Sequence, residues 1–256
     1  MSVSRKDKKI TIVMPAYNAA KTLEKTYLEI PDGSYDEIIL VDDASKDNTV
    51  ELAKKLNLII VEHQDNKGYG ANQKSCYKKA LERGADVIVM LHPDFQYDPR
   101  IIPNIALPII EGQADIVLAS RMIRDPMLGG PIKGGMPVYK FIANRLLTFF
   151  ENLALGTYFS EFHTGYRAFS REALESIPFD LNSDDFVFDN EIIVQGIIKK
   201  LRFKEIPVIT KYFKDASSVN FIRSVRYGAQ VIWTTLKYLM HKYKIKSFKQ
   251  FDINRI

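Results

Sequence analysis

The sequence predicts an α/β fold in which a mostly parallel central sheet is flanked by helices. Short apolar segments alternate with segments of helical spacing, which is the pattern of successive βαβ units. Apolar residues make up 46% of the 256 residues, enough for a substantial buried core. The single cysteine, Cys76, excludes an intramolecular disulfide and any multi-cysteine zinc site. At this length we expect one domain or two closely joined halves.

The first five predicted strands are apolar runs that each end in a polar turn. Pro15 ends the first run, and Asp42 and Asp43 follow the second. The predicted strands cover residues 9–14, 36–41, 58–61, 86–91 and 115–119. Helical spacing between them predicts helices over residues 22–30, 46–56, 70–83 and 99–111.

The chain changes character after Arg121. A glycine-containing loop over 127–136 precedes an amphipathic helix predicted over 137–155. A late strand is predicted over 203–209, and a long helix over 221–243. The expected division is a disordered lead-in over 1–9, a folded domain over 10–215 with halves 10–121 and 122–215, and a C-terminal helical segment over 216–256.

Positive charge is concentrated in that C-terminal segment. From Asn220 onward the chain has eight Lys or Arg and a single acid, Asp252, interleaved with Tyr, Phe and Trp233. Such a basic, aromatic, amphipathic segment favours peripheral contact with an anionic membrane surface. The alternative is a helix that packs its apolar face on the core, with its bases in water. We assign the core to residues 221–233 and the membrane to 237–249.

Other partners and locations are limited by what the sequence lacks. No recognition motif accompanies the basic residues, so nucleic acid is not expected as a partner. No apolar run approaches the roughly 18–20 residues that span a bilayer, and no signal-peptide core follows Met1. We therefore expect a cytoplasmic protein.

Polar side chains follow four of the predicted strands: Tyr17 and Asn18, Asp42 and Asp43, the His92–Gln96 segment, and Arg121. In parallel sheets ligands bind beyond the carboxyl ends of the strands. Acids placed like Asp42 accept hydrogen bonds from a ribose or a base, although an Asx turn into a capped helix is an alternative. The absence of GxGxxG and of a P-loop motif argues against NAD, FAD and P-loop nucleotide sites.

The segment from His92 to Asp98 is a candidate metal site. Asp94 supplies a carboxylate, Gln96 an amide oxygen and His92 an imidazole, and alternate residues of an extended segment project to the same side. The alternative is a surface turn with a helix cap at Asp98. Gly70, with Gly68, lies just before a predicted helix, where the backbone could approach a ligand or simply enter the helix.

Taken together, these motifs resemble the family 2 glycosyltransferases of GT-A fold, a Rossmann-like α/β architecture. The resemblance rests on IVMPAYN at 12–18, VDDASKDNT at 41–49, NKGYGA at 66–71 and HPDFQ at 92–96. TGYRAFSREA at 164–173 and EIPV at 205–208 resemble the branch that makes dolichyl- or polyprenyl-phosphate mannose or glucose. The resemblance covers roughly residues 10–225.

The resemblance implies an inverting transfer from a nucleotide-diphosphate sugar with a divalent metal, Mn²⁺ or Mg²⁺. The implied donor-binding residues are Pro15, Ala16, Tyr17, Asn18, Asp42, Asp43, Gly70 and Asp94. The family's Asp-x-Asp metal motif falls on His92-Pro93-Asp94, so histidine replaces the first acid, and Gln96 matches a glutamine of this branch. Arg121 matches an arginine that faces phosphate.

The implied acceptor is a polyprenyl phosphate or a cell-envelope glycan precursor at the inner face of the membrane. Its candidate residues are Arg121, Arg167 and Ser218, although the pattern usual around Ser218 is altered. A hydroxyl acceptor requires a base, for which Asp189 or Glu191 is the candidate, whereas a phosphate monoester is already anionic. These acids could instead cap or solvate a helix, and Arg167 could pair with one of them. The alternative function is a non-catalytic nucleotide-sugar-binding module in which His92 marks an impaired metal site.

Overall fold

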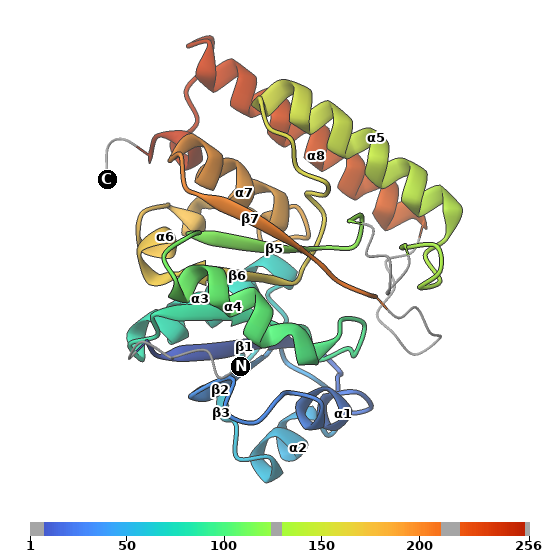
Figure 1. Ribbon diagram of the computed structural model, residues 1–256, viewed down its shortest axis with the longest axis vertical. Coiled ribbons are helices and arrows are strands. Elements are labelled where there is room, and N and C mark those ends of the chain that lie inside the picture. Colours follow the sequence, from blue (N-terminus) through green and yellow to red (C-terminus); the bar gives the residue numbers. More distant parts are fainter. Residues whose placement is uncertain (1–7, 124–129, 211–220, 254–256) are drawn as a thin grey trace.

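The computed structural model describes residues 8–123, 130–210 and 221–253, and their centre is a seven-stranded sheet with helices on both faces (Figure 1). The strand order across the sheet is β3-β2-β1-β4-β6-β5-β7. The strands are β1 (Ile10–Ala16), β2 (Glu37–Asp42), β3 (Ile59–Glu62), β4 (Val87–Met90), β5 (Ile116–Ser120), β6 (Arg167–Ser170) and β7 (Phe203–Pro207).

One strand runs against the others. β6 pairs antiparallel with both β4 and β5, while all other neighbouring strands are parallel. The carboxyl ends of β1, β2 and β4 therefore meet at one edge of the sheet. The segments that follow these three strands are brought together there, as expected for a ligand-binding edge.

The helices form layers on the sheet. α1, α2 and α4 cover one face, and α3, α6 and α7 cover the other. α8 packs on α7, and α5 lies beside α8 as the outermost layer (Figure 1). The helices are α1 (Leu23–Leu28), α2 (Thr49–Lys55), α3 (Tyr69–Glu82), α4 (Ile102–Ile110), α5 (Val138–Leu155), α6 (Arg171–Glu175), α7 (Phe188–Ile198) and α8 (Phe221–Lys242), with short 3-10 turns at Pro99–Ile101, Phe179–Leu181 and Lys249–Phe251.

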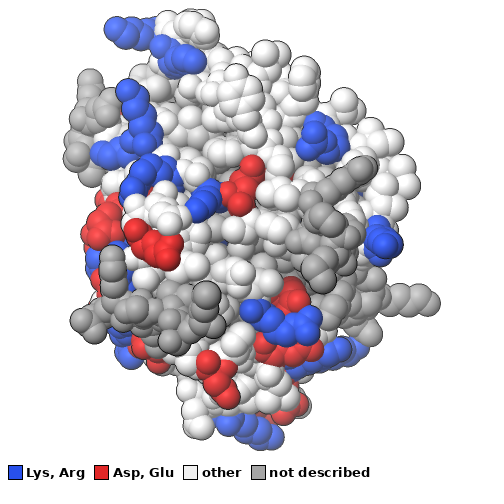
Figure 2. Space-filling model, viewed as in Figure 1, with Lys and Arg blue, Asp and Glu red and all other residues white. Residues whose placement is uncertain are grey.

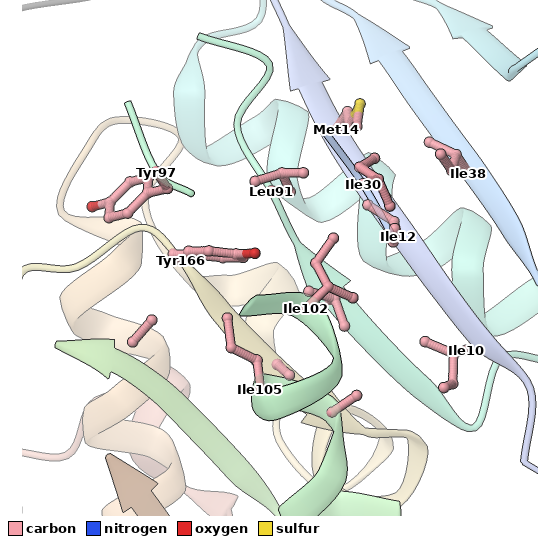
Figure 3. Close-up of a cluster of buried hydrophobic side chains, with 14 of the residues drawn as sticks. Ile10, Ile12, Met14, Ile30, Ile38, Leu91, Tyr97, Ile102, Ile105 and Tyr166 are labelled. Carbon is pink, nitrogen blue, oxygen red and sulfur yellow. The ribbon is translucent and has the colours of Figure 1, made fainter. Parts of the chain in front are cut away.

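The core follows from the two-residue period of the strands. On β1, Ile10, Ile12 and Met14 point to the α1–α2–α4 face, and Val13 points to the opposite face. Figure 3 shows Ile10, Ile12 and Met14 in one cluster with Ile102 and Ile105 of α4 and with Tyr97 and Tyr166, whose rings are tilted at 56° to each other. Each buried branched side chain of this kind contributes about 1.5–3 kcal/mol. The packing fixes where each strand ends, and so where the polar segments begin.

The predicted strands and the helices with predicted ranges are confirmed, with ends shifted by a few residues, but no range was predicted from the sequence for β6, α6 or α7. β6 has four residues and begins with Arg167, so it lacks the apolar run that marks the other strands. The sheet contains strands from both expected halves, and the division into 10–121 and 122–215 stays a prediction. The backbone N–H of Lys9 donates to Asp86 at 2.8 Å, so order begins within the predicted lead-in. No helix in the described part of the chain combines the length and the apolar character needed to cross a bilayer.

Candidate active site

Backbone strain marks the edge where β1, β2 and β4 end. Asn18, Ala44 and Phe95 follow these three strands and have φ angles of 51°, 60° and 59°, in the left-handed region. The other non-glycine residues with positive φ in the described chain each follow a helix, where such a conformation is an ordinary cap. Strain held in non-glycine residues concentrates at functional sites. Here it singles out the loops that the motifs indicate.

The end of β2 holds a buried acceptor without a partner. The side chain of Asp42 is 3% exposed, and its Oδ2 accepts the backbone N–H of Ser45 at 2.8 Å. Its Oδ1 is buried and has no hydrogen-bond donor among the described residues. The bond from Ser45 to Asp42 spans three residues, so it is not the Asx turn that Asp43, Ser45 and Asp47 were expected to form, and it engages one of the two carboxylate oxygens of Asp42. Tyr17, at the end of the neighbouring strand, is 51% exposed.

Asp43 lies beside Asp42 but is fully engaged within the protein. Its Oδ1 accepts hydrogen bonds from His63 Nδ1 at 2.8 Å and from the backbone of Lys67 at 2.9 Å, and its Oδ2 accepts the backbone N–H of Gly68 at 3.0 Å. The carboxylate thereby fixes the loop that leads into α3. A donor-binding role for Asp43 stays a prediction.

Gly70 faces another segment of the chain. Its N–H donates to the carbonyl of Asp184 at 2.8 Å, and a Cβ added to it would collide with Ser183 and Phe188. A Cβ on Gly68 would lie 2.7 Å from the same carbonyl of Asp184. These contacts explain both glycines by close packing of the α3 N-terminus, which is the helix-entry alternative. A direct role for Gly70 in donor binding stays a prediction.

The candidate metal segment has the predicted alternation. His92, Asp94 and Gln96 are partly exposed, whereas the residues between them are buried. The backbone N–H of Gln96 donates to Asp94 Oδ1 at 3.0 Å. Asp98 accepts the backbone N–H of Arg100 at 3.0 Å and caps the following turn. The cap expected at Asp98 is therefore present, and a metal site at His92, Asp94 and Gln96 stays a prediction.

His92 is held by a short chain of hydrogen bonds. Its Nε2 lies 3.1 Å from the hydroxyl of Tyr69, whose ring stacks on the imidazole at 5.4 Å. Tyr69 donates its one proton to Asp189 Oδ2 at 2.7 Å, so Nε2 of His92 is the protonated nitrogen and Nδ1 carries the lone pair. Burial lowers the pKa of His92, although Asp94 and Asp189 nearby favour its charged form. A neutral imidazole with a fixed tautomer is the form that binds metals.

The donor set fits a cation that is shared with a ligand. No group of three or more His, Cys, Asp or Glu side chains in the described residues could hold a metal by themselves. Mg²⁺ at phosphate sites is typically bound through one or two carboxylates, and phosphate oxygens and water complete its coordination. Asp94 with His92 and Gln96 supplies such a set.

Asp189, a candidate base, is buried and fully hydrogen-bonded. It accepts hydrogen bonds from Tyr69 and, at 2.9 Å, from Gln73, and it pairs with Arg167 at 3.3 Å. Arg167 is 0% exposed and also donates to the backbone carbonyls of Asp189 and Phe162. The structure therefore supports the alternative in which Arg167 pairs with an acid. A role for Arg167 toward an acceptor stays a prediction.

Glu191, the other candidate base, connects helices. Its Oε2 accepts the backbone N–H of Ser183 at 2.6 Å, and its Oε1 binds Lys237 of α8 at 2.9 Å and Gln250 at 3.2 Å. The side chains of Glu191 and Lys237 are both largely buried. Glu191 therefore stabilises the packing of α7 against α8.

Arg121 lies at the end of β5 and pairs with a buried acid. Its Nε donates to Glu161 Oε1 at 2.8 Å, its backbone N–H donates to Oε2 at 2.8 Å, and its Nη2 donates to the carbonyl of His163 at 2.9 Å. Burial raises the pKa of Glu161, but the Arg121 guanidinium outweighs it and holds the pKa below the usual range. Ser218 lies outside the described residues.

Comparison with known proteins decides the family. A family model described as Glycosyl transferase family 2 matches residues 11–177. The chain belongs to glycosyl transferase family 2. Its relatives include a UDP-N-acetylglucosamine–dolichyl-phosphate N-acetylglucosaminyltransferase of Methanococcus voltae, 33% identical over 80% of this chain and 87% of the relative. A dolichol-phosphate mannosyltransferase of Pyrococcus furiosus is 26% identical over 75% of this chain and 54% of the relative.

Solved structures agree on the fold of this family 2 glycosyltransferase. Glucosyl-3-phosphoglycerate synthase from Mycobacterium tuberculosis, crystallised with Mn²⁺, UDP-glucose and phosphoglyceric acid, matches with a TM-score of 0.70 at 19% identity, over 92% of this chain and 81% of that chain. The predicted family, its polyprenyl-phosphate branch and the GT-A fold are confirmed.

Three residues around the glycosyltransferase site are not predicted from the sequence. Tyr69 and Glu161 lie 23 and 40 positions from their partners His92 and Arg121, so only the fold brings each pair together. Gly165 lies against His92, because an added Cβ would be 2.8 Å from Nε2. Tyr69 and Gly165 lie inside two of the motifs that carry the resemblance, and this position in a motif is the signal in the sequence that could have identified them.

Proposed function

We propose that this glycosyltransferase transfers a sugar, with inversion, from a uridine-diphosphate sugar to a polyprenyl phosphate at the cytoplasmic face of a membrane. One observation carries the proposal: the edge where β1, β2 and β4 end combines the unpaired oxygen of Asp42 with the partly exposed Asp94 and His92. An acceptor for a nucleoside and a ligand set for a diphosphate-bound cation thus lie at one edge of the sheet.

The donor side is supported by Asp42 and Tyr17. Desolvating a carboxylate oxygen without a partner is costly, so a donor group from the nucleoside would stabilise Asp42 Oδ1. The exposed ring of Tyr17 offers a surface at the same edge. The Methanococcus relative is named for UDP-N-acetylglucosamine, which makes that donor the first to test.

Asp94, His92 and Gln96 would hold Mn²⁺ or Mg²⁺. When bound, such a cation neutralises charge that develops on a departing diphosphate. Tyr69 and Asp189 contribute by keeping the His92 ring in one orientation and one tautomer. In related structures Mn²⁺ or Mg²⁺ accompanies UDP, which supports the same class of cation here.

The acceptor side is supported by the state of the two candidate bases. Asp189 and Glu191 are each buried and hydrogen-bonded to several partners, so neither is poised to remove a proton from a hydroxyl. A phosphate monoester needs no base, because its second pKa is about 6. Arg121 is the candidate for contact with the acceptor phosphate, and Glu161 balances its charge. A role for Ser218 stays a prediction.

A second function is kept because of His92. Histidine stands where the family has the first metal-binding acid, which makes the site less negative. A chain that binds the donor without transferring its sugar could have this substitution. Such a binding module would keep Asp42 and Tyr17 while losing the chemistry at Asp94.

Transfer of radiolabelled N-acetylglucosamine from its UDP conjugate to polyprenyl phosphate in detergent tests the proposal. We expect label in the lipid extract, dependent on Mn²⁺ or Mg²⁺ and lost with EDTA. Asp94→Ala should abolish the signal, and Asp98→Ala, a change to the capping acid of the same segment, should retain most of it. UDP binding with no transfer of any nucleotide sugar to lipid phosphate would establish the binding module instead.

A further inference from the structure

The imidazole ring of His92 is enclosed by three other residues. Tyr69 stacks on it, with the ring centroids 5.4 Å apart and the ring planes at 11° to each other. Phe186, from the loop before α7, stacks in turn on Tyr69 at 4.6 Å. Gly165 lies against the edge of the imidazole, because an added Cβ would be 2.8 Å from Nε2 and 3.1 Å from Cδ2. The ring therefore has little room to turn.

The group that holds the imidazole is itself fixed from behind. The hydroxyl of Tyr69 donates to Asp189 at 2.7 Å, and Asp189 also accepts from Gln73 at 2.9 Å and pairs with Arg167 at 3.3 Å. Gln73 and Arg167 are fully buried. A ligand that is oriented by such a buried network keeps one tautomer and one ring position. Here the network engages Nε2 of His92 and assigns the lone pair to Nδ1.

The remaining nitrogen lies on the side of the ring that is bonded to the candidate metal segment. Nδ1 is attached directly to Cγ, so it is the ring nitrogen nearer to the backbone that also carries Asp94 and Gln96. The segment therefore offers one nitrogen, one carboxylate and one amide oxygen as donors. One of these three donors carries a negative charge.

This mixed donor set does not suit all divalent cations equally. Mg²⁺ takes oxygen ligands and is bound through carboxylates, whereas imidazole is a ligand of first-row transition cations. Mn²⁺ accepts the same oxygen ligands as Mg²⁺ but belongs to the first-row series, so it can use all three donors. A neutral imidazole also supplies no charge, which removes part of the attraction on which binding of Mg²⁺ depends.

We infer that His92 determines which cation this site prefers: its Nδ1 nitrogen makes the site select a first-row transition cation such as Mn²⁺ over Mg²⁺. The inference deepens the proposed function and rests on it for the presence of a cation bound to a diphosphate. Tyr69, Phe186 and Gly165 act as positioning residues, because they hold the ring and do not supply a ligand atom.

The competing explanation is a histidine that only fills space between neighbouring segments. Such a residue would need its stacking and its bond to Tyr69 but would have no use for Nδ1. Tyr69 is the one hydrogen-bond partner that the described residues give to His92, and it uses Nε2. The two explanations therefore differ in one observable, namely whether a histidine nitrogen binds the metal.

Pulsed electron paramagnetic resonance of Mn²⁺ bound to the wild-type protein with UDP tests the inference without any variant. We expect hyperfine coupling to a nitrogen, with a pattern that changes when the protein is made with isotope-labelled histidine. Acidic side chains occur at several separate places on the surface in Figure 2, and these can bind Mn²⁺ weakly. Such carboxylates supply oxygen alone, so the nitrogen coupling distinguishes the site from them. His92→Asn should lose the coupling.

The preference itself is measured by displacing Mn²⁺ with Mg²⁺ in the presence of UDP. His92→Asp replaces the nitrogen by a second carboxylate and should lower the ratio of Mn²⁺ affinity to Mg²⁺ affinity about 10-fold. The matched control is His241→Asp, which makes the same change near the end of α8 and should leave the ratio as in the wild type. Thermal unfolding confirms that each variant is folded.

The outcomes separate this inference from the proposed function. Mn²⁺ bound with UDP but without coupling to a histidine nitrogen would overturn the inference and leave the cation of the proposed function in place. An unchanged affinity ratio in folded His92→Asp would overturn it as well. If neither Mn²⁺ nor Mg²⁺ binds the wild-type protein with UDP, the inference and the cation site of the proposed function are both wrong. None of these measurements depends on sugar transfer.

Discussion

Acids occur in two places near the site, and the structure uses them differently. Asp42 and Asp94 lie at strand ends, where one has a buried oxygen without a partner and the other is partly exposed. Asp189 and Glu191 lie at the start of α7 and are buried against Arg167 and Lys237. We propose that the same residue type serves ligands at these strand ends, whereas on the helix it serves packing. The partners of an acid, more than its position in a motif, decide which of the two applies.

The largest expected effect is on catalysis at Asp94. Asp94→Ala should lower sugar transfer ~10³-fold or more, because a cation bound there contributes several kcal/mol to the transition state. Its melting temperature should stay within about 2 °C of the wild type, since the side chain is partly exposed. Steady-state kinetics with thermal unfolding checks both parts. An Asp94→Ala variant with a clearly lower melting temperature, or with near-normal transfer rates, would contradict the distinction between acids at the strand ends and acids on α7.

Asp189 should behave in the opposite way. Asp189→Ala leaves the buried Arg167 without its carboxylate and should cost about 3–5 kcal/mol in the free energy of unfolding. Denaturant unfolding measures this. Arg202→Met breaks the more exposed pair with Asp115 and should cost no more than about 1 kcal/mol. If Asp189→Ala keeps its stability and loses only transfer, the packing role given to Asp189 is wrong.

Glu161 is a further acid that serves packing, and its contribution to the free energy of unfolding should depend on pH. Its pKa in the folded protein is lowered from the ordinary value of 4.5, so its stabilising effect is fully present above that pH and is lost as pH falls through the folded pKa. Glu161→Gln should therefore be less stable than the wild type by about 2 kcal/mol at neutral pH. The difference should shrink below pH 4.5. A difference that grows in acid would contradict the pairing with Arg121.

Tyr69→Phe should give the smallest effect. Loss of the hydroxyl removes the hydrogen bonds to His92 and Asp189 while the stacked ring stays, at a cost of about 1 kcal/mol in stability. Mn²⁺ affinity in the presence of UDP, measured by electron paramagnetic resonance, should fall several-fold, because His92 is no longer held in one tautomer. Tyr27→Phe, at another partly buried tyrosine, is the control. Unchanged Mn²⁺ affinity in Tyr69→Phe would remove this role.

The sheet and the site segments were predictable because their signals are local. The apolar runs of β1, β2 and β4 and the acids that follow them are adjacent in sequence, so Asp42 and Asp94 could be assigned to one edge. β6 could not be predicted because it has only four residues and begins with Arg167. This arginine is buried, and its charge is paired with Asp189. Such a residue appears as a surface position until its partner is known.

The roles of Arg167, Asp189 and Glu191 depend on contacts between distant segments. Sequence left open whether Arg167 faces an acceptor or pairs with an acid, and in the structure it pairs with Asp189 while Glu191 pairs with Lys237. The outward direction of the apolar side chains of α5 could not be predicted for a related reason. A helical period shows that one face is apolar, but it does not say whether that face turns inward or outward, and only the packing of Asn144 and Glu151 does so.

A crystal grown with UDP and Mn²⁺ tests the central claim most directly, through the anomalous signal of the metal. The account predicts a manganese peak at the carboxylate of Asp94 that also contacts the diphosphate, with Asp189 still bound to Tyr69 and Arg167. A peak at Asp189 or Glu191, or a diphosphate bound away from Asp94, would contradict it.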